Sequence, residues 1–425
     1  MATIGTMTIA LDHYDPTAAP WRDDPHPALA ESRREQPVFR CPALSAWVVT
    51  RYADVAAVAS DGDRFSSADV LKPLGGVCPA AQRVLEGGYD LDQLRPIVSL
   101  DPPDHGPLRR VVASAFTPRR VAGLEPRIRA LAEGLVDGFA TDGEVDLVAR
   151  FAYPLPLAVI MELLEIPAAD RGDIKRWADD RVALMWGGLP AEEQVRCARS
   201  YVEFQHYLGT LVDDRRAHPG DDFISDLAAA VTSEGRRLDR SELVGQLTSV
   251  ASAGHETTTN LIAIGVAHLL ADRRQWRDLC ADPTLAAAAV EEILRFDGPA
   301  KAMPRTATTD VEVAGVRIPA GERVLPMFTS ANRDATVFPD ADRFDIHRPR
   351  PDHPHLGFGR GQHYCAGAGL ARLEGRVALE VLARRLPGLR LEPAVPLRFR
   401  ANVVIRSLHE LRLRWESPAP VAVKP

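Results

Sequence analysis

The sequence lacks several features that would assign it to whole classes of protein. No apolar run reaches the ~20 residues that a membrane-spanning helix needs. Residues 1–14 have no basic segment ahead of an apolar core, so neither a secretory signal nor a membrane anchor is expected. The five cysteines are scattered and form no Cys-x-x-Cys pair, which disfavours a disulfide framework and a structural zinc site. We therefore expect a cytoplasmic protein with reduced thiols.

Two further absences concern partners and domains. Acidic residues outnumber basic ones by 58 to 51, and the net charge of −7 argues against nucleic acid as a partner. No linker, charge block or internal repeat divides the 425 residues, so we predict one domain over 1–425, with poorly ordered tails at 1–20 and 416–425. With 46% hydrophobic residues, the chain can bury an extensive core.

Helical spacing of apolar residues dominates the chain, and short strands are predicted only within 38–50 and 311–318. The fold class is therefore mainly α with small β sheets. The longest helical pattern follows a capping-box signature at 239–242 and runs about 30 residues without proline, a rod of about 45 Å. Its middle contains Gly254, His255 and Glu256, which are unfavourable in a helix with apolar flanks.

A second unusual stretch is Phe358-Gly359-Arg360-Gly361-Gln362-His363-Tyr364-Cys365-Ala366-Gly367, which precedes another helical pattern. Gly359 and Gly361 supply backbone conformations that are closed to other residues. Cys365 would lie where the helix begins, and there free amide groups and the helix dipole stabilise a thiolate. The ordinary alternative is a buried, inert Cys365, which is the usual fate of a free cysteine.

Together, these two stretches resemble motifs of the cytochrome P-450 family. The cysteine stretch resembles the haem-ligand signature, and 253–258 resembles the motif of the oxygen-binding helix. The resemblance extends over about 21–414 and implies a haem b held between the long central helix and the cysteine-loop helix. It implies that Cys365 is the iron ligand and that the other haem contacts include Phe358, Gly359, Gly367, Ala253 and Gly254.

The resemblance also implies roles for charged and hydroxyl side chains. Thr257 would hydrogen-bond O2, and Glu256 would link the site to solvent protons. The alternative is a surface Glu256 beside threonines that bond the preceding turn. The groups that would pair with the haem propionates are His105, Arg109, Arg305 and His363. A solvated basic helix is the ordinary alternative for His105 and Arg109, which are one turn apart.

Three further residues, Glu292, Arg295 and Arg348, resemble the family's buried Glu/Arg/Arg triad. Five stretches are expected to wall the substrate pocket: 71–89, 177–190, 247–257, 299–303 and 401–405. The pocket candidates within them are Met185, Val250, Ala300, Lys301 and Val403. For Lys301 we favour an ammonium that reaches water, and the alternative is that it pairs with a carboxylate or phosphate-like group of the substrate.

The implied activity is insertion of one oxygen atom from O2 into a small-to-medium secondary metabolite or xenobiotic, by hydroxylation or epoxidation. No reductase domain is expected after Pro425, so electrons from NAD(P)H would arrive through a ferredoxin or flavodoxin-type donor. This donor would dock on a basic face near Cys365 that comprises Arg109, Arg110, Arg119, Arg360, Arg372 and Arg376.

Other functions of the same scaffold stay open. They include oxidative coupling, desaturation, peroxide-driven oxidation and a haem-binding auxiliary without catalysis. The Glu256-Thr257 pair favours O2 over peroxide as the oxidant, and the intact cysteine and oxygen motifs argue against a silent auxiliary.

Overall fold

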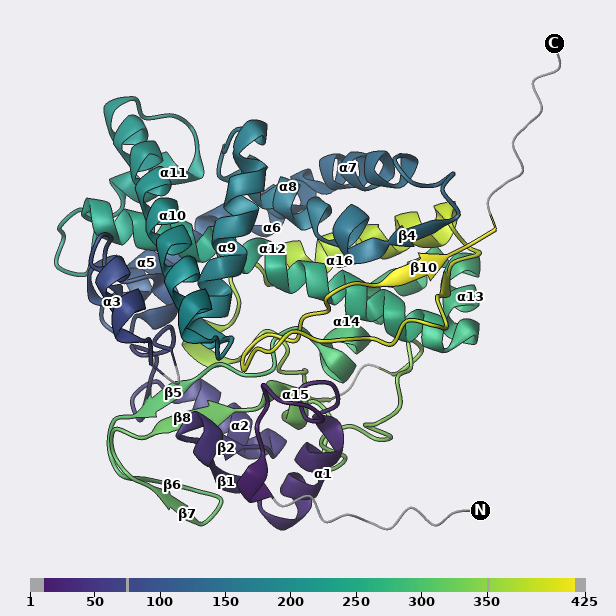
Figure 1. Ribbon diagram of the computed structural model, residues 1–425, viewed down its shortest axis with the longest axis horizontal. Helices are drawn as coiled ribbons and strands as arrows, with labels where there is room; N and C mark the ends of the chain where they lie inside the picture. Colours follow the sequence, from purple (N-terminus) through teal and green to yellow (C-terminus); the bar gives the residue numbers. More distant parts are fainter. Residues whose placement is uncertain (1–10, 74–75, 350–351, 417–425) are drawn as a thin grey trace.

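The computed structural model describes residues 11–73, 76–349 and 352–416, which form a mainly helical structure with three small sheets (Figure 1). The predicted fold class is therefore confirmed. None of the described helices is both long enough and apolar enough to cross a membrane.

The long helix α12 (Arg240–Ala271) runs through the middle of the helical region (Figure 1). It begins with the predicted capping box, in which the Asp239 carboxylate accepts from the Glu242 amide and the Glu242 carboxylate accepts from the Asp239 amide. Most of its side chains are buried, because helices pack on it from several sides. Among these neighbours are α8 (Pro154–Leu163), α9 (Arg171–Trp186), α10 (Ala191–Ala217), α14 (Ala286–Asp297) and α16 (Ala368–Arg385).

The remaining helices complete the two flanks and the region around the largest sheet. They are α1 (His26–Glu35), α2 (Tyr52–Ser60), α3 (Pro79–Leu85), α4 (Leu91–Leu94), α5 (His105–Ala115), α6 (Pro118–Gly123), α7 (Glu125–Asp137), α11 (Phe223–Ala229), α13 (Arg273–Ala281) and α15 (Phe328–Ala331). In Figure 1, α3, α5, α10 and α11 lie at one end of α12, and α7, α13 and α16 lie toward the other.

The largest sheet has the order β1-β2-β8-β5-β3, and only its β2–β8 pair is parallel. Its strands are β1 (Val38–Cys41), β2 (Ala46–Val49), β3 (Phe65–Ser66), β5 (Arg305–Ala307) and β8 (Arg323–Pro326). A second sheet joins β4 (Glu144–Asp146), β10 (Arg412–Arg414) and β9 (Arg390–Leu391). The predicted hairpin is β6 (Val311–Val313) with β7 (Val316–Ile318).

Part of the predicted N-terminal tail, within residues 11–20, packs against the rest of the chain. Tyr14 is buried, and its ring packs edge-on against the rings of Trp21 and Phe39. The Tyr14 carbonyl also accepts a hydrogen bond from the Cys41 thiol. This aromatic contact packs the segment against the core. The rest of the two predicted tails, 1–10 and 417–425, lies outside the described residues.

The predicted triad is present as a buried charge network. The Glu292 carboxylate accepts two hydrogen bonds from Arg295, at 2.7 and 2.8 Å, and another from the Arg348 guanidinium at 3.1 Å. Arg295 also donates to the carbonyls of Asn332 and Ala341. The network therefore fixes α14 to the irregular segment that leads to the cysteine loop.

We predict that Glu292→Ala lowers the free energy of unfolding by roughly 3 to 5 kcal/mol, because it leaves two guanidinium groups in the core without their anion. The purified variant should also lose haem. Thermal unfolding and the ratio of haem to protein measure both effects.

The matched control is Glu162→Ala, which removes an equally bidentate pair with Arg127 at the surface. This change should cost less than about 1 kcal/mol. Full haem content in Glu292→Ala would contradict the structural role of the triad.

Candidate active site

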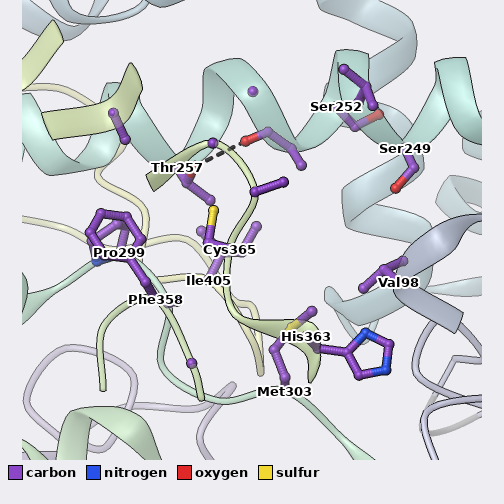
Figure 2. A pocket seen from close by; sticks show the side chains of 18 of the residues that line it. Val98, Ser249, Ser252, Thr257, Pro299, Met303, Phe358, His363, Cys365 and Ile405 are labelled. Atoms are coloured by element: carbon purple, nitrogen blue, oxygen red, sulfur yellow. Dashed lines mark hydrogen bonds between the residues drawn. The ribbon is translucent and has the colours of Figure 1, made fainter. Parts of the chain in front are cut away.

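A cavity of about 300 Å³ lies between α12 and the loop that carries Cys365. All five stretches predicted to wall a pocket contribute to its lining, with Leu71, Trp186, Val250, Ala300 and Ile405 as examples. Figure 2 shows Thr257, Ser249 and Ser252 on the helix, with Cys365 and Met303 on the segments below it. Thr257 and Cys365 therefore come from opposite walls of one cavity.

The cysteine loop has the backbone conformation that its glycines predict. Gly359 and Gly361 have φ values of 70° and 74°, and a Cβ on Gly361 would lie 2.8 Å from the Cα of Ser60. Cys365 lies three residues before α16, and its amide donates to the Phe358 carbonyl. Burial raises the pKa of the Cys365 thiol, whereas the nearby Gly367 amide lowers it. A coordinated cation would deprotonate this thiol.

The four basic side chains predicted to hold the haem all line the same cavity: His105 and Arg109 of α5, Arg305 of β5, and His363 of the cysteine loop. The rings of His105 and His363 are 4.4 Å apart, and the Nε2 atom of each is buried without a partner. Burial and the positive charges of its neighbours lower the pKa of His363 to about 3. Burial also lowers the pKa of Arg305, to about 10. The cluster thus favours an anion beside it.

The middle of α12 stays α-helical, and threonines bond to the preceding turn. The Thr257 hydroxyl donates to the Ala253 carbonyl at 2.9 Å (Figure 2), and the Thr259 hydroxyl donates to the His255 carbonyl at 2.9 Å. Gly254 is required by packing, because a Cβ there would lie 2.7 Å from the Ile160 side chain. Ala253, Gly254 and Thr257 line the cavity and therefore face the cysteine loop.

Comparison with known proteins identifies the family. Residues 272–387 match the family model described as Cytochrome P-450. The vitamin D(3) 25-hydroxylase of Pseudonocardia autotrophica is 38% identical over 408 residues, which cover 95% of this chain and 97% of that protein. The mycinamicin IV hydroxylase/epoxidase of Micromonospora griseorubida is 40% identical over 412 residues, which cover 94% and 99%. The chain belongs to the cytochrome P-450 family.

A solved P-450 structure has the same fold. The structure of cytochrome P-450 CREJ in complex with (4-ethylphenyl) dihydrogen phosphate matches this chain with a TM-score of 0.89 and 35% identity, covering 96% of this chain and 100% of that one. This P-450 is accordingly a haem-dependent monooxygenase that uses O2.

The residues around the cavity fit the haem of this P-450. A haem carries two carboxylates, and four basic side chains converge on the cavity with two imidazole nitrogens unpartnered. It also needs an axial ligand, and Cys365 is the cavity cysteine. Phe358, Gly359 and Gly367 line the cavity as well, so every predicted haem contact lies on its wall.

Glu256 lies beside the cavity wall rather than on it. Its Oε2 atom is buried without a hydrogen-bond partner. Burial, and then the negative charge of Asp179, raise the pKa of Glu256 to about 8. Asp179 accepts hydrogen bonds from Tyr153 at 3.0 Å and from Lys175 at 2.8 Å, and the Tyr153 hydroxyl lies 2.9 Å from His255. Glu256 therefore borders a polar network that reaches the half-exposed Lys175.

Three of the five predicted pocket residues do not line the cavity, and each is one residue from a residue that does. Met185 packs in the core while Trp186 lines the cavity, and Val403 packs beside β8 while Val404 lines it. Lys301 reaches neither the cavity nor water, because its buried ammonium donates to the Asn402 carbonyl. Val250 and Ala300 do line the cavity.

Sequence reasoning missed Arg181, which is only 4% exposed and lines the cavity from α9. It follows Asp179 and Asp180, and such a charged run usually indicates a solvated face. The available signal was its spacing, four residues from both Trp177 and Met185, which places it on the apolar face.

The predicted basic face is smaller than the sequence indicates. Arg372 forms a bidentate pair with Glu291, and Arg376 pairs with both Glu125 and Glu380. Arg109 is half-buried and lines the cavity. The arginines of the predicted set that stay exposed are Arg110, Arg119 and Arg360.

We predict that Glu256→Gln makes the stability of the fold depend less on pH. An unfolded glutamate ionises near pH 4.5, whereas Glu256 keeps its proton up to about pH 8. Folding therefore takes up a proton within this window, and stability falls as pH rises through it. The variant should match the parent near pH 5 and melt a few degrees higher near pH 8.5.

The control for this test is Glu192→Gln, which changes an exposed side chain of α10. Its melting temperatures should follow those of the parent at both pH values. An equal response of Glu256→Gln and Glu192→Gln would show that Glu256 is already ionised at neutral pH.

Proposed function

We propose that this P-450 oxidises a small-to-medium, largely apolar secondary metabolite by hydroxylation or epoxidation, with Cys365 as the haem ligand. The observation that carries the proposal is the placement of the Cys365 sulfur and the Thr257 hydroxyl on opposite walls of one cavity. Side chains such as Val98, Val182 and Trp186 make much of the remaining wall apolar. The two relatives named above, whose names denote hydroxylation and epoxidation, support this reaction class.

Each residue of the site has a proposed task. A bound haem supplies the one-electron and O2 chemistry that side chains cannot supply. Cys365 holds its iron, and the four basic side chains pair with its propionates and so fix its orientation. Thr257 offers a hydroxyl to O2 at the cavity wall.

Glu256 is proposed to hold the proton that this hydroxyl passes on. With its pKa raised to about 8, the carboxyl is protonated at neutral pH and can act as an acid. Asp179 and Lys175, which pair with each other near this carboxyl, would supply the polar route to solvent. Burial raises the pKa of Asp179, but the His255 imidazole, 3.9 Å away, and the charge of Lys175 outweigh it and lower that pKa to about 2.

Electrons are proposed to come from NAD(P)H through a separate ferredoxin or flavodoxin-type protein. Its acidic surface would face Arg110, Arg119 and Arg360, the arginines of the predicted face that stay exposed. A cytoplasmic location is part of this proposal, because all five cysteines are free thiols, as a reducing compartment requires.

We predict that Cys365→Ser abolishes the reduced carbon monoxide spectrum of a thiolate-ligated haem and, with it, product formation. Serine keeps the side-chain size but offers a hydroxyl in place of the soft sulfur donor. The measurement is the carbon monoxide difference spectrum, followed by product analysis with a surrogate ferredoxin and its reductase. Cys280→Ser, which changes a cysteine outside the cavity wall, should behave as the parent. A thiolate spectrum in Cys365→Ser would refute the assignment.

We also predict that Thr257→Ala keeps the haem but lowers the product formed per NAD(P)H roughly fivefold, the factor for losing one hydrogen bond of about 1 kcal/mol. The electrons from NAD(P)H then reduce O2 to hydrogen peroxide instead of forming product. NAD(P)H consumption, peroxide and product are measured together. Thr259→Ala is the control. Thr259 lies two residues after Thr257, its buried hydroxyl donates to the His255 carbonyl, and it does not line the cavity. Unchanged coupling in Thr257→Ala would remove the hydroxyl from the mechanism.

A further inference from the structure

Arg181 is a buried cation on the cavity wall that lacks a protein anion. Its side chain projects from α9 and is 4% exposed, and its Nε atom is buried without a partner. Among the residues that the structure describes, no ion pair or hydrogen bond of its guanidinium is present. The guanidinium carbon lies 5.8 Å from the centroid of the Tyr201 ring.

The carboxylates nearest to Arg181 along the chain and in space are engaged elsewhere or protonated. Asp180 pairs with Arg196 at 2.8 Å, and Asp179 bonds to Lys175 and Tyr153. The charge of Arg181 lowers the pKa of Glu256, but burial outweighs this effect and raises that pKa to about 8. The Glu256 carboxyl is therefore neutral at pH 7. None of them neutralises the guanidinium.

Burying a guanidinium costs folding free energy unless an acceptor group pairs with it. Burial removes the hydration of the Nε atom, and no N–H donor of this side chain has an acceptor among the described residues. Arginine is also the side chain best suited to carboxylate and phosphate, because its planar fork matches two oxygens at once. The missing partner is therefore an anionic oxygen group that enters the cavity.

We propose that Arg181 binds an anionic oxygen group, a carboxylate or a phosphate monoester, at one end of the substrate. The inference rests on the proposed function, because it takes this cavity as the substrate site. The apolar wall formed by residues such as Val182 and Ile160 would hold the body of the substrate. The hydroxyl of Ser249, on the cavity wall in Figure 2, offers a further donor.

This anion site is separate from the four basic residues proposed to hold the haem. Those residues come from α5, β5 and the cysteine loop, whereas Arg181 comes from α9, which packs on α12. A substrate bound to Arg181 would thus be anchored from the α9 side of the cavity. Its far end would be the part free to approach the haem.

The test compares matched ligands on the haem-loaded protein. The anionic probes are 4-alkylbenzoates and 4-alkylphenyl phosphates with ethyl, butyl and octyl chains, and their neutral counterparts are the 4-alkylbenzamides. Dissociation constants come from isothermal titration calorimetry and from the spin-state shift of the haem. We expect the parent to prefer at least one anionic probe over its amide by about tenfold, as for a charge-assisted hydrogen bond.

In Arg181→Met this preference should fall to within about twofold, while amide affinity stays as in the parent. Arg176→Met, which removes an exposed arginine of the same helix, should keep the preference. If Arg181→Met does not load haem, Arg181→Gln replaces it. The benzoate and phosphate arms decide which anion fits.

Two results would overturn the proposal: a parent that prefers no anionic probe over its amide, and an Arg181 variant that keeps the preference. Failure of the proposed function is a different result. It appears as the absence of a thiolate spectrum or of any oxidised product, whereas a charge preference is measured without turnover.

Discussion

The burial of α12 on nearly every side is the constraint on which the rest of the structure depends. Three glycines let neighbours approach the helix closely, since a Cβ would lie 2.0 Å from the Leu94 carbonyl at Gly245, 2.7 Å from Ile160 at Gly254 and 2.4 Å from Ile293 at Gly265. Each glycine costs roughly 1 kcal/mol of helix propensity relative to alanine. The close contacts with α4, α8 and α14 offset this cost and fix the helix in place. Thr257 is thereby held opposite the cysteine loop.

Two buried carboxylates of the core lie beside arginines, whereas several basic groups on the cavity wall have no anion beside them in the described part of the chain. Glu292 has its two arginines, and Asp297 lies 2.6 Å from the Arg406 guanidinium. Beside the cavity, by contrast, His105, His363 and Arg181 each have a buried nitrogen without a partner. Because buried polar groups are nearly always satisfied, an unpartnered group on a cavity wall is a candidate for contact with a ligand. Two of them face the proposed propionates and one faces the proposed substrate.

Features that depend on short-range order could be predicted from the sequence. The capping box at Asp239 and the turns at Gly359 and Gly361 are set by a few adjacent residues, and the structure contains each of them. Predicting the triad needed only the local spacing of Glu292 and Arg295 and a match to one distant arginine, Arg348. Local chemistry therefore locates the haem end of the site well.

The substrate end could not be predicted equally well, because it depends on side-chain direction and on distant partners. Met185, Lys301 and Val403 each miss the cavity by one residue. Lys301 and Val403 lie in irregular segments, where no periodicity gives side-chain direction, and Met185 lies in the last turn of α9, where direction depends on how the helix packs. Arg181 shows the second limit. Its neighbour Asp180 looks like a natural counterion until Arg196, on α10, is seen to bind that carboxylate. Pairing between α9 and α10 thus takes up the neighbouring carboxylate and leaves Arg181 without an ion pair among the described residues.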